Sequence, residues 1–245
     1  MITTVRDLAA DQSRLRRLAG WSGIGMAAAI VINGPLSIAL GRIPSHWTAD
    51  AATQISAYLT DQANITQSVI FFALSNLIFV FALGFFAGLR GLAAETDPSG
   101  WLTGVVTIGA ALFLAGGLVS EILSTGIAVV LGSTPAYVFD INNALLLQGL
   151  WVTALAQGQV ALGVVMVTLS TATLRTRALP AWLSWLGIAT GIIAVLRPAV
   201  VTNVPLFFVS FQPVFLWIVS LAIVLLRQAR KPSRPHPGGD HGGGL

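Results

Sequence analysis

The fold of this chain is decided by residues 101–131, which read WLTGVVTIGAALFLAGGLVSEILSTGIAVVL. The run exceeds the roughly 20 apolar residues that an α-helix needs to cross the ~30 Å hydrocarbon core of a bilayer, and Glu121 is its only charged residue. Strands of a transmembrane barrel are about 10 residues long and alternate in polarity, which this run does not. The stretch therefore predicts a membrane-spanning helix.

Five further segments have the same apolar character, and they lie at residues 20–41, 67–89, within 141–174, 181–196 and 205–226. Of the 245 residues, 55% are hydrophobic and only 9% are charged, whereas a soluble domain is about 25% charged. The mean hydropathy is +0.83. These features predict an all-α fold, a polytopic membrane bundle of six transmembrane helices, and they exclude a soluble enzyme.

The fifth segment, 181–196, is short, because it supplies only about 24 Å of helix before Arg197. This span must continue past Arg197, thin the bilayer, or let Arg197 reach outward.

Basic residues decide the orientation. All lysines and arginines except Arg42 and Arg197 fall on one side of the six predicted spans, and positive charge in short loops stays in the cytoplasm. We therefore expect both termini to be cytoplasmic. Topology explains the basic excess, so it does not indicate a nucleic-acid partner.

We expect the chain to divide into three parts. These are a cytoplasmic amphipathic arm (1–19), the six-helix transmembrane domain (20–227, with an outer loop at 42–66) and a disordered cytoplasmic tail (228–245). The arm carries an apolar face that suits the inner leaflet, and the tail is rich in Pro and Gly. Within the outer loop, the helical spacing of Ile55, Tyr58 and Leu59 predicts a short helix at the outer surface.

Several chemistries are excluded by residue type. The chain has no cysteine, its only lysine is Lys231 in the tail, and its histidines are His46, His236 and His241, all outside the apolar segments. Thiol chemistry, an embedded Schiff base and an embedded histidine site for a metal or haem are therefore excluded. No phosphate-binding loop, metalloprotease motif or dinucleotide fingerprint occurs, so we expect no enzyme, no catalytic residue, no metal and no cofactor.

Glu121 is the strongest single signal in the sequence. An ionisable group inside a span is costly unless it is neutral, paired or in contact with water. Gly117, Ser124 and Thr125 share its helical face, and such small and hydroxyl residues indicate a face turned toward the bundle. Two interpretations fit: a carboxylate that binds a proton, a cation or a substrate, or a protonated or paired side chain that holds helices together.

Four other polar residues are expected at a similar depth, and they are Asn33, Asn76, Gln148 and Arg197. Their shared depth motivates the hypothesis that they converge with Glu121 on a polar pocket open to the outside. Arg197 has two alternative fates, which are to reach the outer headgroups or to pair with Glu121.

Two local features concern helix shape and packing. Pro35 follows Asn33 and Gly34 and cannot donate to the carbonyl of Val31, so the first span should kink or break there. Two GxxxG patterns, at residues 84–88 and 187–191, predict close packing of helices within the chain rather than dimerisation.

Three stretches together are similar to a known family. They are Arg17–Gly20, Glu121 in the third span, and LPAWLSWLG at 179–187. With these, the chain resembles the bacterial domain-of-unknown-function 4386 family (DUF4386) from about residue 15 to 226. The resemblance implies a six-helix fold in a bacterial cytoplasmic (plasma) membrane and supplies no activity. Members often carry an arginine three residues before the glutamate, where this chain has Leu118.

Function stays open between classes at this point. The first is a small-solute or ion/proton-coupled transporter-like protein with a polar pocket at Glu121. The second is a non-catalytic membrane scaffold that binds a partner membrane protein, and the third and weakest is a lipid-modifying enzyme. The expected partners are the lipid bilayer, a small solute or a membrane protein, and no nucleic acid.

Overall fold

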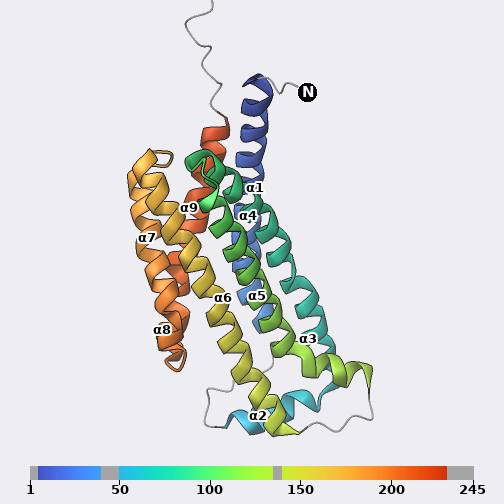
Figure 1. Ribbon diagram of the computed structural model, residues 1–245. Helices are drawn as coiled ribbons and strands as arrows, with labels where there is room; N and C mark the ends of the chain where they lie inside the picture. Colours follow the sequence, from blue (N-terminus) through green and yellow to red (C-terminus); the bar gives the residue numbers. More distant parts are fainter. Residues whose placement is uncertain (1–4, 40–49, 135–139, 231–245) are drawn as a thin grey trace, which may run out of the picture.

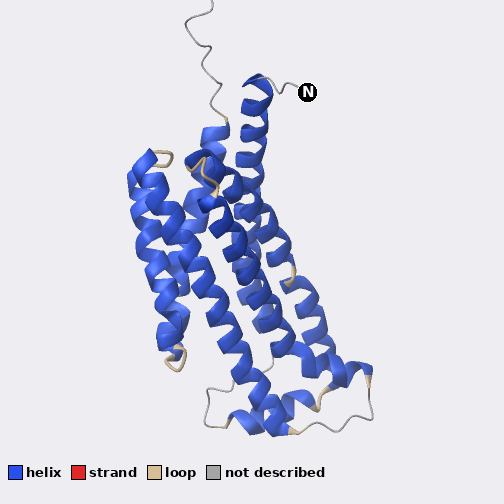
Figure 2. Ribbon diagram, in the orientation of Figure 1, coloured by secondary structure: helices blue, strands red, loops and turns tan. Residues whose placement is uncertain are grey.

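A computed structural model describes residues 5–39, 50–134 and 140–230, with side chains for 11–33, 50–134, 140–203, 206, 207 and 209–230. Its elements in chain order are α1 (Val5–Ala39), α2 (Ala51–Leu59), α3 (Gln62–Ser75), α4 (Leu77–Thr96), α5 (Trp101–Ser133), α6 (Ile141–Thr176), α7 (Ala181–Leu196), the 3₁₀ turn η1 (Arg197–Val200), α8 (Val204–Val209) and α9 (Phe211–Ala229). All of the secondary structure in these residues is helical (Figure 2).

Six helical spans are long and apolar enough to cross a membrane, and this confirms the all-α membrane bundle. The chain is a multi-pass membrane protein. The second span consists of α3 and α4, and the fifth continues from α7 through η1, so the short fifth segment does extend past Arg197. The start of α1 and the end of α9 lie at the same end of the bundle (Figure 1), as an even number of crossings requires.

The spans follow one another around the bundle and close into a ring. α5 packs against α3, α4 and α6, α7 packs against α6 and α9, and α1 lies between α4 and α9. The largest apolar cluster fills the centre with Phe85, Leu89, Val165, Trp217 and Leu221, each at most 1% exposed. This cluster occupies the half of the bundle toward the chain ends.

Glycines bring neighbouring helices to backbone contact. The first GxxxG pattern packs on α1, where Gly88 faces Ala19. The second packs on α6, where Gly191 faces the backbone of Gly163. Close packing within the chain is therefore confirmed for both patterns, as small residues on both sides let backbones approach.

The first helix runs without a break from Val5 to Ala39. The expected arm, residues 1–19, thus continues directly into the first span, and Leu15 and Ala19 pack against glycines of α4. The helix also continues through Pro35, so the expectation of a break there is wrong. A bend at Pro35 stays a prediction.

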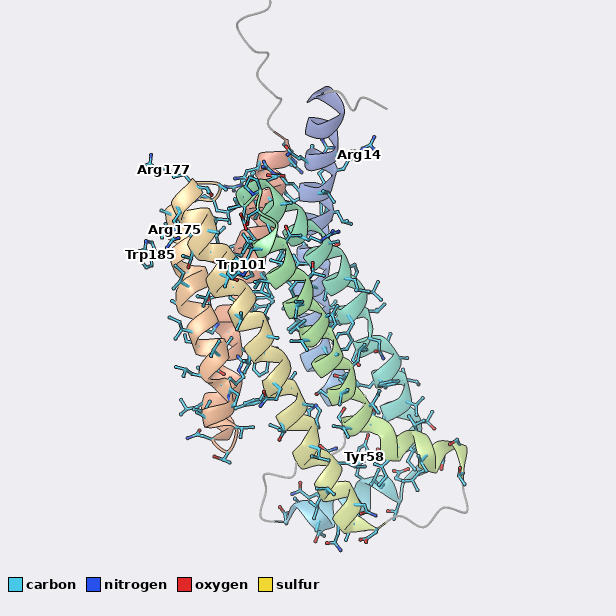
Figure 3. All side chains as sticks on the ribbon, in the orientation of Figure 1. Arg14, Tyr58, Trp101, Arg175, Arg177 and Trp185 are labelled. Carbon is cyan, nitrogen blue, oxygen red and sulfur yellow. The ribbon has the colours of Figure 1, made fainter. Side chains whose placement is uncertain are left out.

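Basic and aromatic side chains mark one end of the molecule, which we call the basic end. Arg14, Arg175 and Arg177 lie there together with Trp101 and Trp185, while Tyr58 lies at the opposite end (Figure 3). Both tryptophans are at least 60% exposed, which is typical of side chains that anchor a protein at a membrane interface. That this end faces the cytoplasm stays a prediction.

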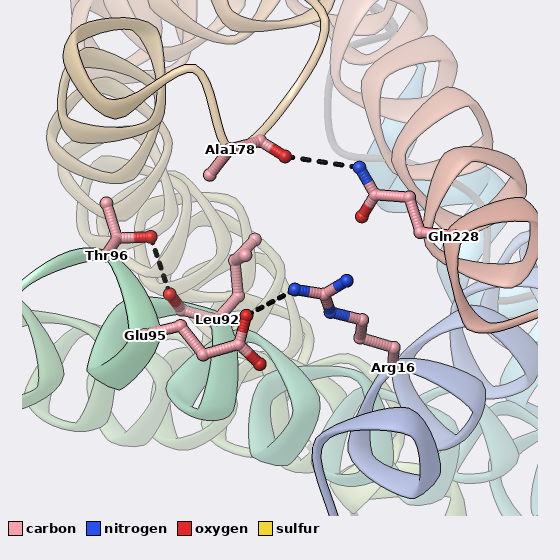
Figure 4. Close-up of polar contacts among 6 residues, drawn as sticks. All are labelled: Arg16, Leu92, Glu95, Thr96, Ala178 and Gln228. Atoms are coloured by element: carbon pink, nitrogen blue, oxygen red, sulfur yellow. Dashed lines mark hydrogen bonds and ion pairs between the residues drawn. The ribbon is translucent and has the colours of Figure 1, made fainter. Parts of the chain in front are cut away.

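Polar contacts join four parts of the chain at the basic end (Figure 4). Arg16 of α1 and Glu95 of α4 form a half-buried ion pair with 2.5 Å between Nη2 and Oε2. Nε2 of Gln228, on α9, donates to the carbonyl of Ala178 in the turn before α7 at 3.1 Å. The ion pair ties the first span to the second, and the hydrogen bond ties the sixth span to the turn between the fourth and the fifth.

The opposite end, which we call the α2 end, is covered by the predicted outer helix. Ile55 and Leu59 of α2 are buried on a second apolar cluster that includes Ile127 and Leu131 of α5. Tyr58 bonds to Ser68 of α3 at 2.7 Å between hydroxyls. Burial raises the pKa of Tyr58, an effect that this hydrogen bond partly offsets. The predicted tail begins three residues too early, because Gln228 and Ala229 belong to α9; the rest of it, 231–245, lies outside the described residues, as do 40–49 and all three histidines.

Candidate functional site

A layer of polar side chains lies between the two apolar clusters. Along α5, the buried face changes from Phe113 of the central cluster to Ser120, Ser124 and Thr125, and then to Ile127 of the α2-end cluster. We call this region the polar layer and define it as Ser75, Ser120, Glu121, Ser124, Thr125 and Gln148. Exposed apolar side chains such as Ile122, Val130 and Leu146 continue around and beyond it, so it lies within the apolar part of the bundle.

Glu121 is half-buried at the contact between α5 and α3. Its Oε2 lies 3.1 Å from Oγ of Ser75, which is 1% exposed. The lipid-facing surface of α5 beside it is formed by Leu118, Val119 and Ile122. The expectation that Glu121 faces the bundle is therefore confirmed.

Ser75 and Asn76 end α3, and this is where the second span is interrupted (Figure 2). Three donors converge on the carbonyl oxygen of Phe72: Oγ of Ser75 at 2.9 Å, Nδ2 of Asn76 at 2.6 Å, and the amide nitrogen of Asn76 at 3.3 Å. Side chains that bond to a nearby carbonyl compete with the helix for it. The interruption lies at these bonds and is confined to Asn76, which keeps helical backbone angles (φ −63°, ψ −19°) and whose amide still bonds to Phe72. Ser75 was not among the predicted site residues.

Gln148 connects α6 to the same layer. It is 4% exposed, and its Nε2 donates to the carbonyl of Ser124 at 3.2 Å. The hydroxyls of Ser124 and Thr125 donate to the carbonyl of Glu121 at 3.0 and 2.7 Å. A chain of hydrogen bonds thereby links α3, α5 and α6 through Glu121.

The remaining predicted residues lie apart from this chain of bonds. Asn33 is half-buried on α1, and none of the hydrogen bonds among the described residues joins it to Glu121. Arg197 is 0% exposed, so it does not reach outward, and within the described residues it forms no ion pair with Glu121. Both fates expected for Arg197 are therefore wrong.

The electrostatics of the polar layer rest on one carboxyl. In the part of the chain that the structure describes, no group of three or more His, Asp or Glu side chains gathers to hold a metal ion. The layer offers one acid, several hydroxyls and one carboxamide, a set that can bind and pass a proton or contact a small polar solute.

Comparisons with protein-family models, with curated proteins and with solved structures find no match for this chain. The resemblance to the DUF4386 family stays a prediction from the residues quoted for it.

Proposed function

We propose that the protein is an ion/proton-coupled, small-solute transporter-like membrane protein in which the carboxyl of Glu121 takes up and releases a proton. The observation that carries this proposal is the contact between Glu121 and Ser75 at the interruption of the second span. Residues of this kind at membrane depth are costly, and they occur chiefly where they bind ions or relay protons.

The hydroxyl of Ser75 suits both protonation states of Glu121. Its single proton can serve only one of its two acceptors, which are the carbonyl of Phe72 at 2.9 Å and the Glu121 carboxyl at 3.1 Å. When Glu121 is ionised, Ser75 donates to it. When Glu121 is protonated, it donates to Ser75, whose own proton turns to Phe72. The pair therefore keeps its hydrogen bond through a protonation cycle.

The two apolar clusters on either side of the polar layer control access to Glu121. The central cluster closes the route from the basic end, and Ile127 and Leu131 with α2 close the route from the α2 end. A proton or solute would therefore reach the polar layer only when the packing of one of the two apolar clusters loosens. Asn76 alone separates α3 from α4, and we expect any movement of α3 relative to α4 to occur at this residue.

The proposal assigns no catalysed reaction and no cofactor. A scaffold that holds a partner membrane protein is the alternative, and it requires Glu121 to be inert.

Infrared difference spectroscopy of the protein in liposomes, recorded between two pH values, tests the proposal. On acidification, the wild type should show one protonated-carboxyl component that Glu121→Gln lacks, beyond the bands of the other acids, which both proteins share. Ser75→Ala should keep the band and shift its frequency, because the carboxyl loses its hydrogen-bond partner. Liposomes that contain a pH-sensitive dye should show proton uptake driven by a membrane potential, and Glu121→Gln should abolish it.

Asp140→Asn is the matched control. Asp140 is an exposed acid that accepts from the amide of Asn142 and caps α6, and asparagine is an equally good cap. This variant should keep the component assigned to Glu121 and the proton uptake of the wild type, and lose only the band of the exposed Asp140 carboxyl. Equal carboxyl bands and equal proton uptake in Glu121→Gln and wild type would contradict the proposal and favour the scaffold.

A further inference from the structure

Arg197 begins η1 at the end of α7 and is completely buried. Its Nε donates to Oγ of Ser210 at 2.8 Å, and its guanidinium carbon lies 3.6 Å from the ring centre of Phe211 and 5.9 Å from that of Phe207. The two terminal nitrogens, Nη1 and Nη2, are buried and have no hydrogen-bond partner among the described side chains and backbone. Four of its five N–H donors are thus unused.

Arg197 lies at membrane depth. Gly191 packs on the backbone of Gly163 in α6, and Arg197 is six residues further along, about 9 Å toward the α2 end. This places it level with the middle of α6, close to where Gly158 meets Gly116 of α5. A guanidinium stays charged in proteins, and a buried charge without a counter-charge costs several kcal/mol.

Each acidic side chain among the described residues has another role. Asp11 pairs with Arg14, Glu95 pairs with Arg16, and Glu121 contacts Ser75. The remaining described acids bond elsewhere, and they are Asp50 with Gln54, Asp61 with Ala63, Asp97 with Leu102 and Asp140 with Asn142. None of them neutralises Arg197.

We propose that Arg197 binds an oxyanion, a carboxylate or phosphate group that comes from outside this chain. Nη1 and Nη2 form the planar fork that matches two oxygens of such a group. Phe211 stacks on the face of the guanidinium and Ser210 holds Nε, so the fork is oriented before any ligand arrives. This inference is independent of the role proposed for Glu121.

Only a short helix, α8, covers Arg197 at the end of the fifth span. α8 follows η1 after the exposed residues Thr202 and Asn203, and it packs chiefly on η1 and α9. Of its described side chains, Leu206 and Val209 are more than half exposed, and Phe207 alone is buried, against Trp151 of α6. Displacement of α8 would open Arg197 at the end of the short fifth span. The oxyanion is either the phosphate of a phospholipid or a free anion, since both share this chemistry.

The test is thermal unfolding of the full chain in an uncharged detergent, followed by tryptophan fluorescence. The oxyanion probes are inorganic phosphate, succinate and dihexanoyl-phosphatidylglycerol. Dihexanoylglycerol serves as the control lipid without phosphate, and choline chloride at equal ionic strength serves as the control for salt. We expect at least one oxyanion probe to raise the unfolding temperature of the wild type in a saturable way. Arg197→Gln should weaken its apparent affinity on the order of a hundredfold, and Arg197→Lys about tenfold, because lysine keeps the charge and lacks the fork.

The controls separate this site from others. Arg175→Gln removes an exposed arginine at the basic end, and it should leave the stabilisation unchanged, as should Glu121→Gln. A response to phosphate or succinate identifies a free anion, and a response to dihexanoyl-phosphatidylglycerol alone identifies a lipid phosphate. The inference is overturned if no probe stabilises the wild type, if dihexanoylglycerol is equally effective, or if Arg197→Gln responds as the wild type does. Should Arg197→Gln fail to fold, an unchanged affinity in Arg197→Lys overturns it as well.

Discussion

The crossing of α5 and α6 is the part of the bundle where a single methyl group should matter most. A Cβ atom at Gly116 would lie 2.9 Å from Cα and 3.0 Å from the nitrogen of Gly158, and 3.1 Å from the carbonyl oxygen of Ala154. All three neighbours are backbone atoms, so no side chain can rotate away. At Gly126, on the same helix, a Cβ atom would meet nothing within 4 Å.

The expected cost of Gly116→Ala follows from these distances. To lengthen the 2.9 Å approach to an ordinary contact of at least 3.4 Å, the two helices must separate by about 0.5 Å. Forcing a methyl group into a packed interior costs about 1–3 kcal/mol, and alanine recovers up to about 1 kcal/mol of helix propensity over glycine. Gly126→Ala gains the same propensity without the clash. We therefore expect Gly116→Ala to be less stable than Gly126→Ala by about 1–3 kcal/mol.

Thermal unfolding in detergent, followed by tryptophan fluorescence, measures the difference. For a chain of this size, 1 kcal/mol corresponds to about 2–4 °C, so the unfolding temperatures of the two variants should differ by about 2–12 °C. Gly104→Ala provides a second control, because its Cβ atom would also meet nothing within 4 Å. Equal unfolding temperatures in Gly116→Ala and Gly126→Ala would refute the backbone contact and, with it, the register of α5 on α6.

Two further predictions concern the basic end. The ion pair between Arg16 and Glu95 is half-buried, so a double-mutant cycle with Arg16→Gln and Glu95→Gln should give a coupling of about 0.5–1 kcal/mol, and additive effects of the two substitutions would contradict the contact. Asp97 accepts hydrogen bonds from the Ser99 hydroxyl and from the amides of Leu102 and Ser99, in this order of effect, and they hold its pKa below the usual 3.8. Asp97 therefore contributes stability above pH 3.8, and this contribution is lost as the pH falls through the lower pKa of the folded state. Unfolding temperatures measured at stepwise lower pH should fall more steeply in the wild type than in Asp97→Asn, and parallel curves would show that Asp97 carries no such contribution.

Much of the fold is predictable from the sequence because the bilayer imposes a strong one-dimensional constraint. Each apolar run must be about 20 residues long, so the spans are recognised by length and composition. The spacing of Ile55 and Leu59 likewise predicts α2, because a helix on an apolar surface must turn one face toward it. The boundary between the predicted arm and the first span is less predictable, since no helix-breaking residue separates the two and one helix runs through both.

The interruption of a span is harder to predict. Pro35 is the residue that most often breaks a helix, yet α1 continues through it, since a proline removes only one backbone donor and the helix ends four residues later. The second span is interrupted instead at Asn76, where the side chains of Ser75 and Asn76 bond to the carbonyl of Phe72. These residue types are common inside helices, so the sequence carries only a weak signal there.

The position of each polar residue around the bundle explains why only some of the residues predicted to surround Glu121 lie near it. A sequence gives the depth of a residue along its span, but contact also depends on which helices are neighbours and how each is rotated. Gln148 belongs to the polar layer because α5 and α6 are adjacent, whereas Asn76 only follows Ser75 of that layer and bonds to Phe72 of its own helix. Arg197 lies across α6, between α7 and α9, and contacts Phe211 and Ser210 instead.

That separation has an electrostatic consequence. An acid and a base buried together would neutralise each other, and such a pair mainly holds helices together. Here the bundle keeps Glu121 on the α3 side of α5 and Arg197 on the α9 side of α6, each with a hydroxyl as its nearest hydrogen-bond partner, Ser75 and Ser210 respectively. A hydroxyl satisfies one hydrogen bond and leaves the charge uncompensated. Both proposals rest on this arrangement, and they assign each site a partner from outside the chain, a proton at Glu121 and an oxyanion at Arg197. If the two groups instead acted as one unit, Glu121→Gln would change the oxyanion affinity of Arg197, and an unchanged affinity in that variant is the result that this reasoning requires.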